Sequence, residues 1–426
     1  MGDKLLAIAA KISSQRHLVA IRDAFIGIMP ITMAGSIAVL LNVFLRDLPS
    51  AAGWDGFVTA MTPIISVNGN VWWGTIAIIS LAFVFALGYC LTNSYDINPL
   101  AGGIVAFASM IAITPQMAYA TTEAGESIGA WGYIGWGYTN SAGLFTAMIV
   151  GLTSAMIFVK LTQKNIIIKL PDSVPPGVNK AFAAIIPGTI AIYIWGTIGY
   201  LVATFLETSV SDLIMKYVQT PFLNLSQGYG AVLLTTIAVS LFWFLGLHGT
   251  NVLAPALDGI YLPALYANTE AVEAGTALPY IWTRGSFDAF AWMGGAGCTI
   301  ALIIAILVLS KVEGERAVAK VAAPMGLFNI NEPVMFGIPI VLNPIYVIPF
   351  TLVPAVLVSI AYAATAIGLV PPVIAAIPWV IPPVLYAYLA TGGSVMAGLL
   401  ALINLVIAVV IWGVFVLIAN KKTVEE

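Results

Sequence analysis

Apolar runs about 20 residues long recur along almost the whole of this chain, and they constrain its fold more than any other feature. A run of this length lets an α-helix cross the hydrocarbon core of a bilayer. Charged residues make up only 8% of the chain, against about 25% in soluble domains, whose surfaces face water. Strands of a membrane barrel would show short segments of alternating polarity, which this sequence lacks. The sequence therefore predicts an all-α polytopic membrane protein.

We expect about ten transmembrane helices and two proline-rich segments, 324–345 and 370–390. Proline removes a backbone donor and clashes with the preceding helical turn, so these two segments are expected to be re-entrant hairpins or broken helices that line a cavity. Segment 249–266 is expected to cross the membrane with breaks at Pro255 and Pro263. The expected spans are 24–45, 71–91, 100–119, 141–160, 181–206, 229–247, 249–266, 288–310, 346–368 and 396–418.

Basic residues gather in a few stretches and indicate the orientation, because positively charged segments stay on the cytoplasmic side. These stretches are 4–22, 160–180, 311–320 and 421–422. Three stretches with almost no basic residues, 46–70, 120–140 and 207–228, are expected to be outward-facing loops. We therefore expect a multi-pass inner-membrane protein with both termini in the cytoplasm.

The polar residues are unevenly distributed, and this predicts a division of labour. Residues 1–22 form an amphipathic pattern typical of a cytoplasmic helix lying on the membrane surface. An N-terminal bundle, 23–160, is almost free of charge in mid-span and is expected to serve as scaffold and dimer interface. A basic, proline-marked hinge at 161–180 leads to a C-terminal bundle, 181–420, which holds nearly all the polar residues in apolar surroundings. We expect the C-terminal bundle to bind and transport the substrate.

The segment GLHGTNVLAPALDGIYLPALY, residues 246–266, is the first candidate site. Polar groups inside a membrane are costly and are suspected of function by default. His248 is a candidate catalytic residue, and Asn251 and Asp258 are candidates for substrate binding. Neighbouring glycines let the backbone approach a ligand closely. The alternative is that His248 caps a helix or bonds a neighbouring carbonyl.

The segment GLFNINEPVMFGIPIVLNPIYVIPF, residues 326–350, is the second candidate site. Glu332 is its only acidic residue, and a lone carboxylate in apolar surroundings must be paired, protonated or in contact with water. We take Glu332 as a candidate catalytic residue. Asn329 and Asn331 supply amide donors and acceptors of the kind that bind sugar hydroxyls. The alternative is that Glu332 simply caps a helix that starts with proline.

Three further residues are weaker candidates for substrate binding. Trp379 could stack on a sugar face, although an interfacial anchor would have the same character. Gln227 precedes a span and is otherwise a plain loop residue. Arg284 is followed by Asp288, and a salt bridge between them is the alternative to substrate contact.

Several function classes are disfavoured. The net charge of −3 gives no reason to expect nucleic acid as a partner. The sequence contains no Walker A motif, no nucleotide-binding glycine loop and no cluster of metal-ligand residues. We therefore expect no metal, no cofactor and no ATPase activity, so that transport is driven by an ion gradient, a partner protein or chemistry on the substrate.

At its two candidate segments the chain resembles the membrane-embedded IIC subunit of a bacterial sugar phosphotransferase system, in the lactose, cellobiose and diacetylchitobiose branch. The resemblance covers nearly the whole chain. The matching segments are IRDAFIGIMPITMAGSIAVLLN (21–42), FWFLGLHGTNVLAPALD (242–258), TRGSFDAFAWMGGAGCTIAL (283–302) and FNINEPVMFGIPIVLNPIYVIPF (328–350). The Asn-Glu-Pro block with its long apolar tail is the most specific of them.

The resemblance implies a homodimeric permease of the bacterial cell membrane that carries a β-linked disaccharide, such as cellobiose, diacetylchitobiose or lactose, inward. It also implies that a separate cytoplasmic IIB subunit donates phosphate from a phosphorylated cysteine, typically to the sugar 6-hydroxyl. Glu332 and His248 match the family residues that lie near the phosphorylated end of the sugar. The alternative is an ion-coupled secondary sugar transporter in which Glu332 and His248 relay protons.

Overall fold

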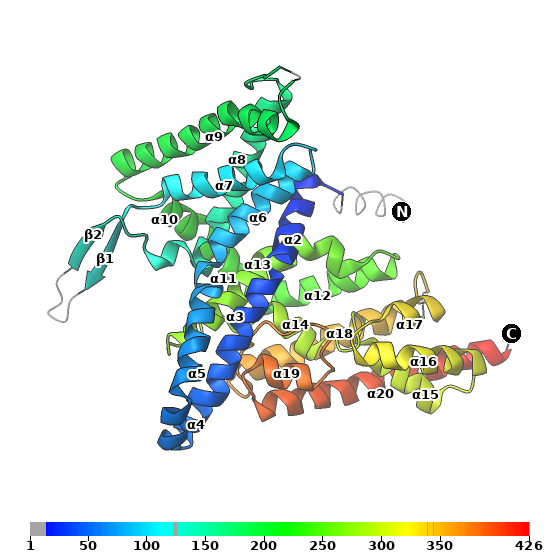
Figure 1. Cartoon of the computed structure of the whole chain (residues 1–426). Coiled ribbons are helices and arrows are strands. Elements are labelled where there is room, and N and C mark those ends of the chain that lie inside the picture. Colours follow the sequence, from blue (N-terminus) through cyan, green and yellow to red (C-terminus); the bar gives the residue numbers. More distant parts are fainter. Residues whose placement is uncertain (1–13, 122–126, 172, 339, 344, 426) are drawn as a thin grey trace. The chain divides into compact units, whose positions relative to one another are not determined.

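The structure, a computed structural model, describes residues 14–121, 127–171, 173–338, 340–343 and 345–425 (Figure 1). Residues 1–13 of the predicted surface helix, together with Pro339 and Pro344, lie outside this range. Backbone contacts divide the chain into two compact units. Unit 1 contains residues 35–71 and those from 224 onward, and unit 2 contains residues 14–34 and 72–223. Every candidate site residue belongs to unit 1.

Unit 2 is built around a bundle in which α6 packs on α7 and α8, and α9 packs on α7 and α8 (Figure 1). The close approach of α6 to α7 depends on Gly88, because a Cβ there would lie 2.5 Å from the Cβ of Ala106. The α-helices of unit 2, in whole or in part, are α2 (Arg16–Gly27), α3 (Met29–Asn42), α6 (Ile79–Asn93), α7 (Pro99–Ile113), α8 (Leu144–Gln163), α9 (Pro176–Leu206), α10 (Val210–Ile214) and α11 (Thr220–Ser226). Its shorter turns are η2 (Ile76–Ile78), η3 (Trp136–Tyr138), η4 (Ser141–Gly143) and η5 (Met215–Gln219).

A β-hairpin follows α7 in unit 2. Strand β1 (Met117–Thr121) pairs antiparallel with β2 (Ser127–Trp131), with Met117 opposite Trp131. The hairpin occupies part of the stretch 120–140 that was predicted to be a loop. Pairing satisfies the backbone groups of a segment that has no helical partners.

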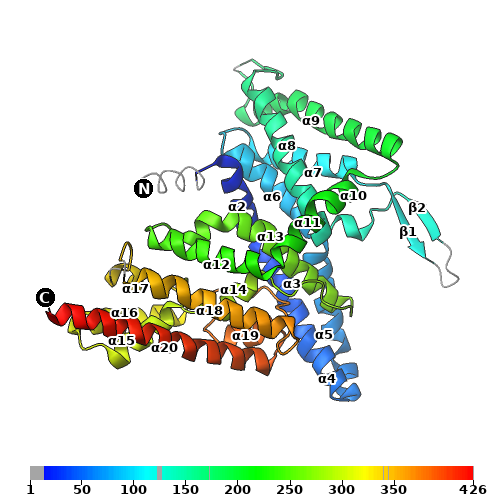
Figure 2. The ribbon, with the colours of Figure 1, turned by 180° about the vertical axis from the view of Figure 1, so that it is seen from behind.

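Unit 1 is a second helical assembly, in which α12 packs on α13 and α18, and α20 packs on α15, α18 and α19 (Figure 2). Besides the ends of α3 and α11, its elements are η1 (Val43–Asp47), α4 (Leu48–Ala51), α5 (Asp55–Trp73), α12 (Tyr229–Phe244), α13 (Gly249–Glu273), α14 (Arg284–Phe290), α15 (Thr299–Leu309), α16 (Glu313–Leu327), α17 (Glu332–Gly337), α18 (Val347–Ala366), α19 (Leu385–Ala390) and α20 (Val395–Glu425). Trp282, Phe287, Phe290, Phe350 and Trp412 are fully buried in it.

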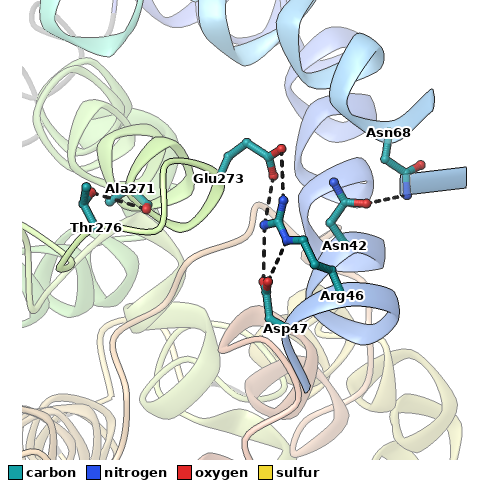
Figure 3. A network of polar contacts seen from close by, with 7 residues as sticks. All are labelled: Asn42, Arg46, Asp47, Asn68, Ala271, Glu273 and Thr276. Carbon is teal, nitrogen blue, oxygen red and sulfur yellow. Dashed lines mark hydrogen bonds and ion pairs between the residues drawn. The ribbon is translucent and has the colours of Figure 1, made fainter. Parts of the chain in front are cut away.

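A polar network ties the N-terminal piece of unit 1 to its long helix α13 (Figure 3). Arg46, on the π-helical turn η1, contacts the neighbouring Asp47 at 2.7 Å and Glu273, at the end of α13, at 3.4 Å. Nearby, the amide of Asn68 on α5 donates to Asn42 on α3 at 2.9 Å. Side-chain pairing of this kind lets charged and amide groups remain among apolar helices. The end of α13 opposite His248 is thereby fixed to η1.

Six helical stretches among the described residues are long and apolar enough to span a membrane, or seven if a bent pair at 210–244 counts as one. They are Met29–Ala51, Asp55–Asn93, Ser141–Gln163, Pro176–Leu206, Val347–Ala366 and Val395–Lys421. The count of ten spans therefore stays a prediction. The stretches 46–70 and 207–228, which we expected as outward-facing loops, are mostly helical, with η1, α4, α5, α10, η5 and α11 in them. Their place outside the membrane stays a prediction. Pro63 and Asn68 interrupt the apolar pattern of α5, and the other helices of these two stretches are short, so none of them shows the uninterrupted apolar run on which the prediction relied.

The proline-rich regions differ from one another. Segment 249–266 is unbroken, because Pro255 and Pro263 both lie inside the continuous helix α13. The predicted breaks there are wrong, since neighbouring groups in a helical membrane protein can accommodate the missing bond. In the region 324–345 the helix does break between α16 and α17, and residues 367–384 contain no helix. Re-entry into the membrane stays a prediction for both.

Candidate functional site

His248 lies at the turn between α12 and α13. Gly246 adopts a φ of +81°, a left-handed conformation that glycine reaches without strain. At Gly249 an added Cβ would lie 2.1 Å from the carbonyl oxygen of Val239, so the start of α13 contacts the α12 backbone directly. His248 is the N-cap of α13, and its Nδ1 accepts the backbone N–H of Asn251 at 3.3 Å. The alternative prediction that His248 caps a helix is confirmed.

The cap uses Nδ1 of His248 and leaves Nε2, the other ring nitrogen, on the side of Glu332. Because Nδ1 accepts a backbone N–H, the ring proton of the neutral form lies on Nε2. Nε2 is 3.8 Å from Oε1 of Glu332, too far for a direct hydrogen bond. The two side chains are 40% and 46% exposed. Both groups can therefore bind a third polar group that enters beside them.

The surroundings favour a neutral imidazole. The ring of His248 lies against the buried indole of Trp243, with ring centroids 4.3 Å apart. Burial lowers the pKa of His248 below its ordinary value, while the Glu332 carboxylate acts in the opposite direction. The neutral ring of His248 thus presents its Nε2–H as a donor beside the Glu332 carboxylate.

Glu332 is the first residue of α17. The N-cap before it, Asn331, makes no side-chain cap bond; it is 4% exposed, and its amide donates to the carbonyl of Ala296 at 3.4 Å. Gly295, with φ +98°, makes room for Asn331, because a Cβ there would lie 2.7 Å from the Cβ of Asn331. Asn331 therefore anchors the start of α17 beneath Glu332, and whether it also contacts substrate stays a prediction.

Asn329 and Trp379 are brought together, but through the backbone. The amide nitrogen of Asn329 donates to the carbonyl of Trp379 at 2.6 Å and to that of Ile381 at 2.8 Å. Its Oδ1 accepts the N–H of Gly294 at 2.7 Å. The Trp379 side chain itself is 51% exposed. The Asn329 amide is thus bonded to three backbone groups, while substrate contact by the exposed Trp379 stays a prediction.

Gln227 is likewise bonded to backbone. Its amide nitrogen donates to the carbonyl of Trp282 at 2.9 Å, and its Oε1 accepts the N–H of the same residue at 2.9 Å. This reciprocal pair imitates the bonding between two strands. The backbone carbonyl of Gln227 also accepts the hydroxyl of Tyr362 at 2.6 Å. Direct substrate binding by Gln227 stays a prediction.

Arg284 forms the centre of an ion-pair triad. It contacts Asp288 at 2.7 Å, which confirms the alternative prediction of a salt bridge, and Asp258 on α13 at 3.2 Å. Its guanidinium also lies 5.4 Å from the ring centroid of Trp292. Across the described ranges, no hydrogen bond or ion pair joins this triad to His248 or Glu332. Substrate contact by Asp258 and Arg284, like that by the exposed Asn251, stays a prediction.

Two positioning residues on α13 were missed by the sequence analysis. The amide of the fully buried Asn268 donates to the carbonyls of Tyr280 and Val373 at 2.8 and 3.1 Å and accepts the N–H of Tyr280. The hydroxyl of Thr269 donates to the carbonyl of Ile374 at 2.6 Å. Both hold the helix-free segment that leads to Trp379. Their position as two adjacent polar residues in a largely apolar helix was the sequence feature that could have identified them.

No group of three or more His, Cys, Asp or Glu side chains that could hold a metal ion occurs within the described part of the chain. A neutral donor and a carboxylate acceptor, close together and half exposed, suit the binding and deprotonation of a hydroxyl.

Residues 22–354 match the family model "Phosphotransferase system, EIIC". The chain belongs to this family. The match includes both His248 and Glu332, and it confirms the resemblance seen in the sequence.

Three relatives show how far the similarity of this EIIC protein extends. It is 42% identical to a cellobiose-specific EIIC component of Lactococcus lactis, over 100% of this chain and 98% of that protein. It is 34% identical to an oligo-beta-mannoside-specific EIIC component of Bacillus subtilis, over 99% and 94% of the two chains. The solved structure of ChbC, the IIC component of an N,N'-diacetylchitobiose-specific system, superposes with a TM-score of 0.92 at 32% identity, covering 98% and 97%. The similarity is therefore one of whole chains.

Proposed function

We propose that this EIIC protein binds a β-linked disaccharide and moves it into the cell, coupled to phosphorylation of the sugar by a separate IIB phosphocarrier. The observation that carries the proposal is the His248–Glu332 pair at 3.8 Å, half exposed, in a chain of this family. Cellobiose is our first choice of sugar, because the relative at 42% identity is named for cellobiose. In this sense the protein is the membrane subunit of a phosphotransferase and does not hydrolyse ATP.

The geometry suggests a division of roles in the phosphate transfer. The Glu332 carboxylate accepts the proton of the sugar 6-hydroxyl as that oxygen attacks the phosphorus of the IIB phosphocysteine. The phosphorus–sulfur bond breaks, and the cysteine leaves as a thiolate. The Nε2–H of His248 donates to the hydroxyl or to an incoming phosphoryl oxygen, where a donor stabilises developing negative charge.

The rest of the sugar requires a broader surface. The indole of Trp379, 51% exposed, is suited to stack on the second ring of a disaccharide. The exposed Asn251, one turn into α13, can add hydrogen bonds to hydroxyls. We propose that four further residues contribute to substrate binding by shaping this surface, because their hydrogen bonds and ion pairs run to other protein groups. These residues are Asn331, Gln227, Asp258 and Arg284.

Purified protein in liposomes tests the proposal. With phosphorylated IIB inside, added cellobiose should appear as cellobiose phosphate, and without the phosphocarrier no sugar phosphate should form. A protonophore should leave this product unchanged. Uptake that needs no phosphocarrier and stops with the protonophore would instead establish the ion-coupled alternative, in which Glu332 and His248 relay protons.

We further propose a multi-pass arrangement of about ten spans in the bacterial cell membrane, with both termini and residues 161–180 in the cytoplasm and with the proline-rich segments 324–345 and 370–390 re-entrant. Functionally, residues 23–160 serve as scaffold and dimer interface, and residues 181–420 serve as transport bundle. This functional division differs from the two compact units, which separate residues 35–71 and those from 224 onward from residues 14–34 and 72–223. Single cysteines introduced at 161–180 should react with a membrane-impermeant reagent only after the membrane is opened. Reaction of these cysteines in intact cells would contradict the proposed orientation and place residues 161–180 outside.

A homodimer is proposed on the same family basis. The bundle 23–160, where we predict the dimer interface, carries large apolar side chains that are exposed on the single chain, among them Val67, Leu100 and Ile104. Such side chains face lipid or a second copy. Light scattering in detergent should give twice the mass of one chain, and a monomer at all protein concentrations would contradict the proposal.

A further inference from the structure

Asn329 has an unusual conformation for a residue proposed to bind sugar. Its φ is +63°, in the left-handed region that asparagine tolerates better than most residues. Both N–H groups of its amide and one acceptor position of its oxygen are bonded to backbone, at Trp379, Ile381 and Gly294. A carboxamide has two donors and one acceptor oxygen, so both donors are already in use.

The segment that Asn329 holds has few backbone partners of its own. Residues 367–384 contain no helix or strand, and Pro378, Pro382 and Pro383 have no N–H to donate. The carbonyls of Trp379 and Ile381 would otherwise be satisfied by water or left unpaired. Asn268 and Thr269 hold the start of this segment at Val373 and Ile374, and Asn329 holds the backbone at Trp379 and Ile381.

Asn329 is also connected to the reactive end of the site. It precedes Glu332 by three residues, and Asn331, between them, is held against Gly295 and Ala296. The short stretch from Asn329 to Glu332 is thus fixed at both ends. The Asn329 carboxamide therefore links the stretch before Glu332 to the backbone at Trp379 and Ile381.

We propose that Asn329 is a positioning residue that sets the separation between the Glu332 carboxylate and the Trp379 indole, and thereby the size of sugar that the site accepts. This inference rests on the proposed function, because it assigns the two ends of the sugar to Glu332 and Trp379. Asn329 then acts on the sugar through Trp379 and makes no direct contact with it.

A double-mutant cycle with cellobiose distinguishes the two roles. Asn329→Gly keeps the left-handed backbone and removes the amide, so the Kd for cellobiose should rise about tenfold, as expected for lost hydrogen bonds in a binding site. In a Trp379→Ala background the same substitution should change the Kd by less than about twofold, because coupled residues are not additive. Asn165→Gly is the matched control, since Asn165 is exposed and also left-handed, with φ +56°. It should leave the Kd unchanged.

Additive effects would mean that Asn329 contacts the sugar itself, and an unchanged Kd in Asn329→Gly would mean that it positions nothing; either result overturns the inference. If the glycine variant does not fold, Asn329→Asp carries the same cycle, because it keeps the acceptor for Gly294 and loses the donors. A failure of cellobiose to bind the wild-type protein speaks against the proposed function instead.

A measurement without sugar tests the positioning directly. Spin labels at the exposed positions Phe336 and Val380, in a protein whose Cys90 and Cys298 are replaced, report the distance between α17 and the Trp379 segment. Asn329→Gly should shift or broaden that distance distribution, and Asn165→Gly should not. An identical distribution in Asn329→Gly would overturn the inference whatever the sugar.

Discussion

Glu332→Gln is expected to lower cellobiose phosphorylation by phosphorylated IIB by about 10²–10⁴-fold, the usual cost of losing a general base. Glutamine keeps the size of the side chain and one acceptor oxygen, but it cannot take the hydroxyl proton. Because Glu332 is 46% exposed and is not buried in the helix core, folding should be preserved. The measurement is the initial rate of sugar phosphate formation in proteoliposomes, at equal protein content and saturating phosphocarrier.

The control for this experiment is Glu313→Gln, which removes an exposed carboxylate in the first turn of α16. It should leave the rate unchanged. Cellobiose binding by Glu332→Gln should weaken more modestly, by roughly tenfold, as expected for a charge-assisted hydrogen bond. Near-native phosphorylation by Glu332→Gln would remove Glu332 from the reaction and leave it as the start of α17.

His248→Ala is expected to lower the same rate by on the order of tenfold to a hundredfold, toward the lower end of what the loss of one stabilising donor costs. Alanine removes two things: the Nδ1 acceptor that caps α13 and the Nε2–H that faces Glu332. The loss of the cap alone should lower the free energy of unfolding by about 1 kcal/mol.

His248→Asn separates these two roles. Asparagine is among the favoured N-cap residues, so it should restore the thermal stability lost in His248→Ala. It lacks a group at the position of Nε2, so the phosphorylation rate should stay low. A rate that returns with asparagine would show that His248 serves only as the cap of α13.

Much of the helical framework was predictable because a membrane helix needs a long apolar run in the sequence. Pro176–Leu206 and Val395–Lys421 follow such runs closely. α5 was predicted as part of a loop, because Asn68 and Pro63 interrupt its apolar pattern. The amide pair between Asn68 and Asn42 explains how a polar residue is accommodated there, and no local pattern reveals a partner on another helix.

The candidate site was predictable in part for a similar reason. His248 and Glu332 stood out as ionisable residues in apolar segments, and the structure brings them together. Asn329 and Gln227 were candidates because their amides can bind hydroxyls, yet both amides bond to backbone. A sequence shows that a polar group needs a partner, but the partner is set by tertiary contacts. Amides that hold loops therefore look the same in a sequence as amides that bind sugars.

The hold of α13 on the segment before Trp379 has a consequence for biosynthesis. Asn268 finds Tyr280 close by in the chain, but its bond to Val373 and the bond from Thr269 to Ile374 each span 105 residues. At roughly 5–20 residues per second, α13 leaves the ribosome about 5–20 s before these partners exist. During that interval the side chains of Asn268 and Thr269 must form hydrogen bonds with water or with other parts of the chain, because lipid supplies no hydrogen bonds. Unit 1 can therefore complete its interior only after most of the chain has been translated.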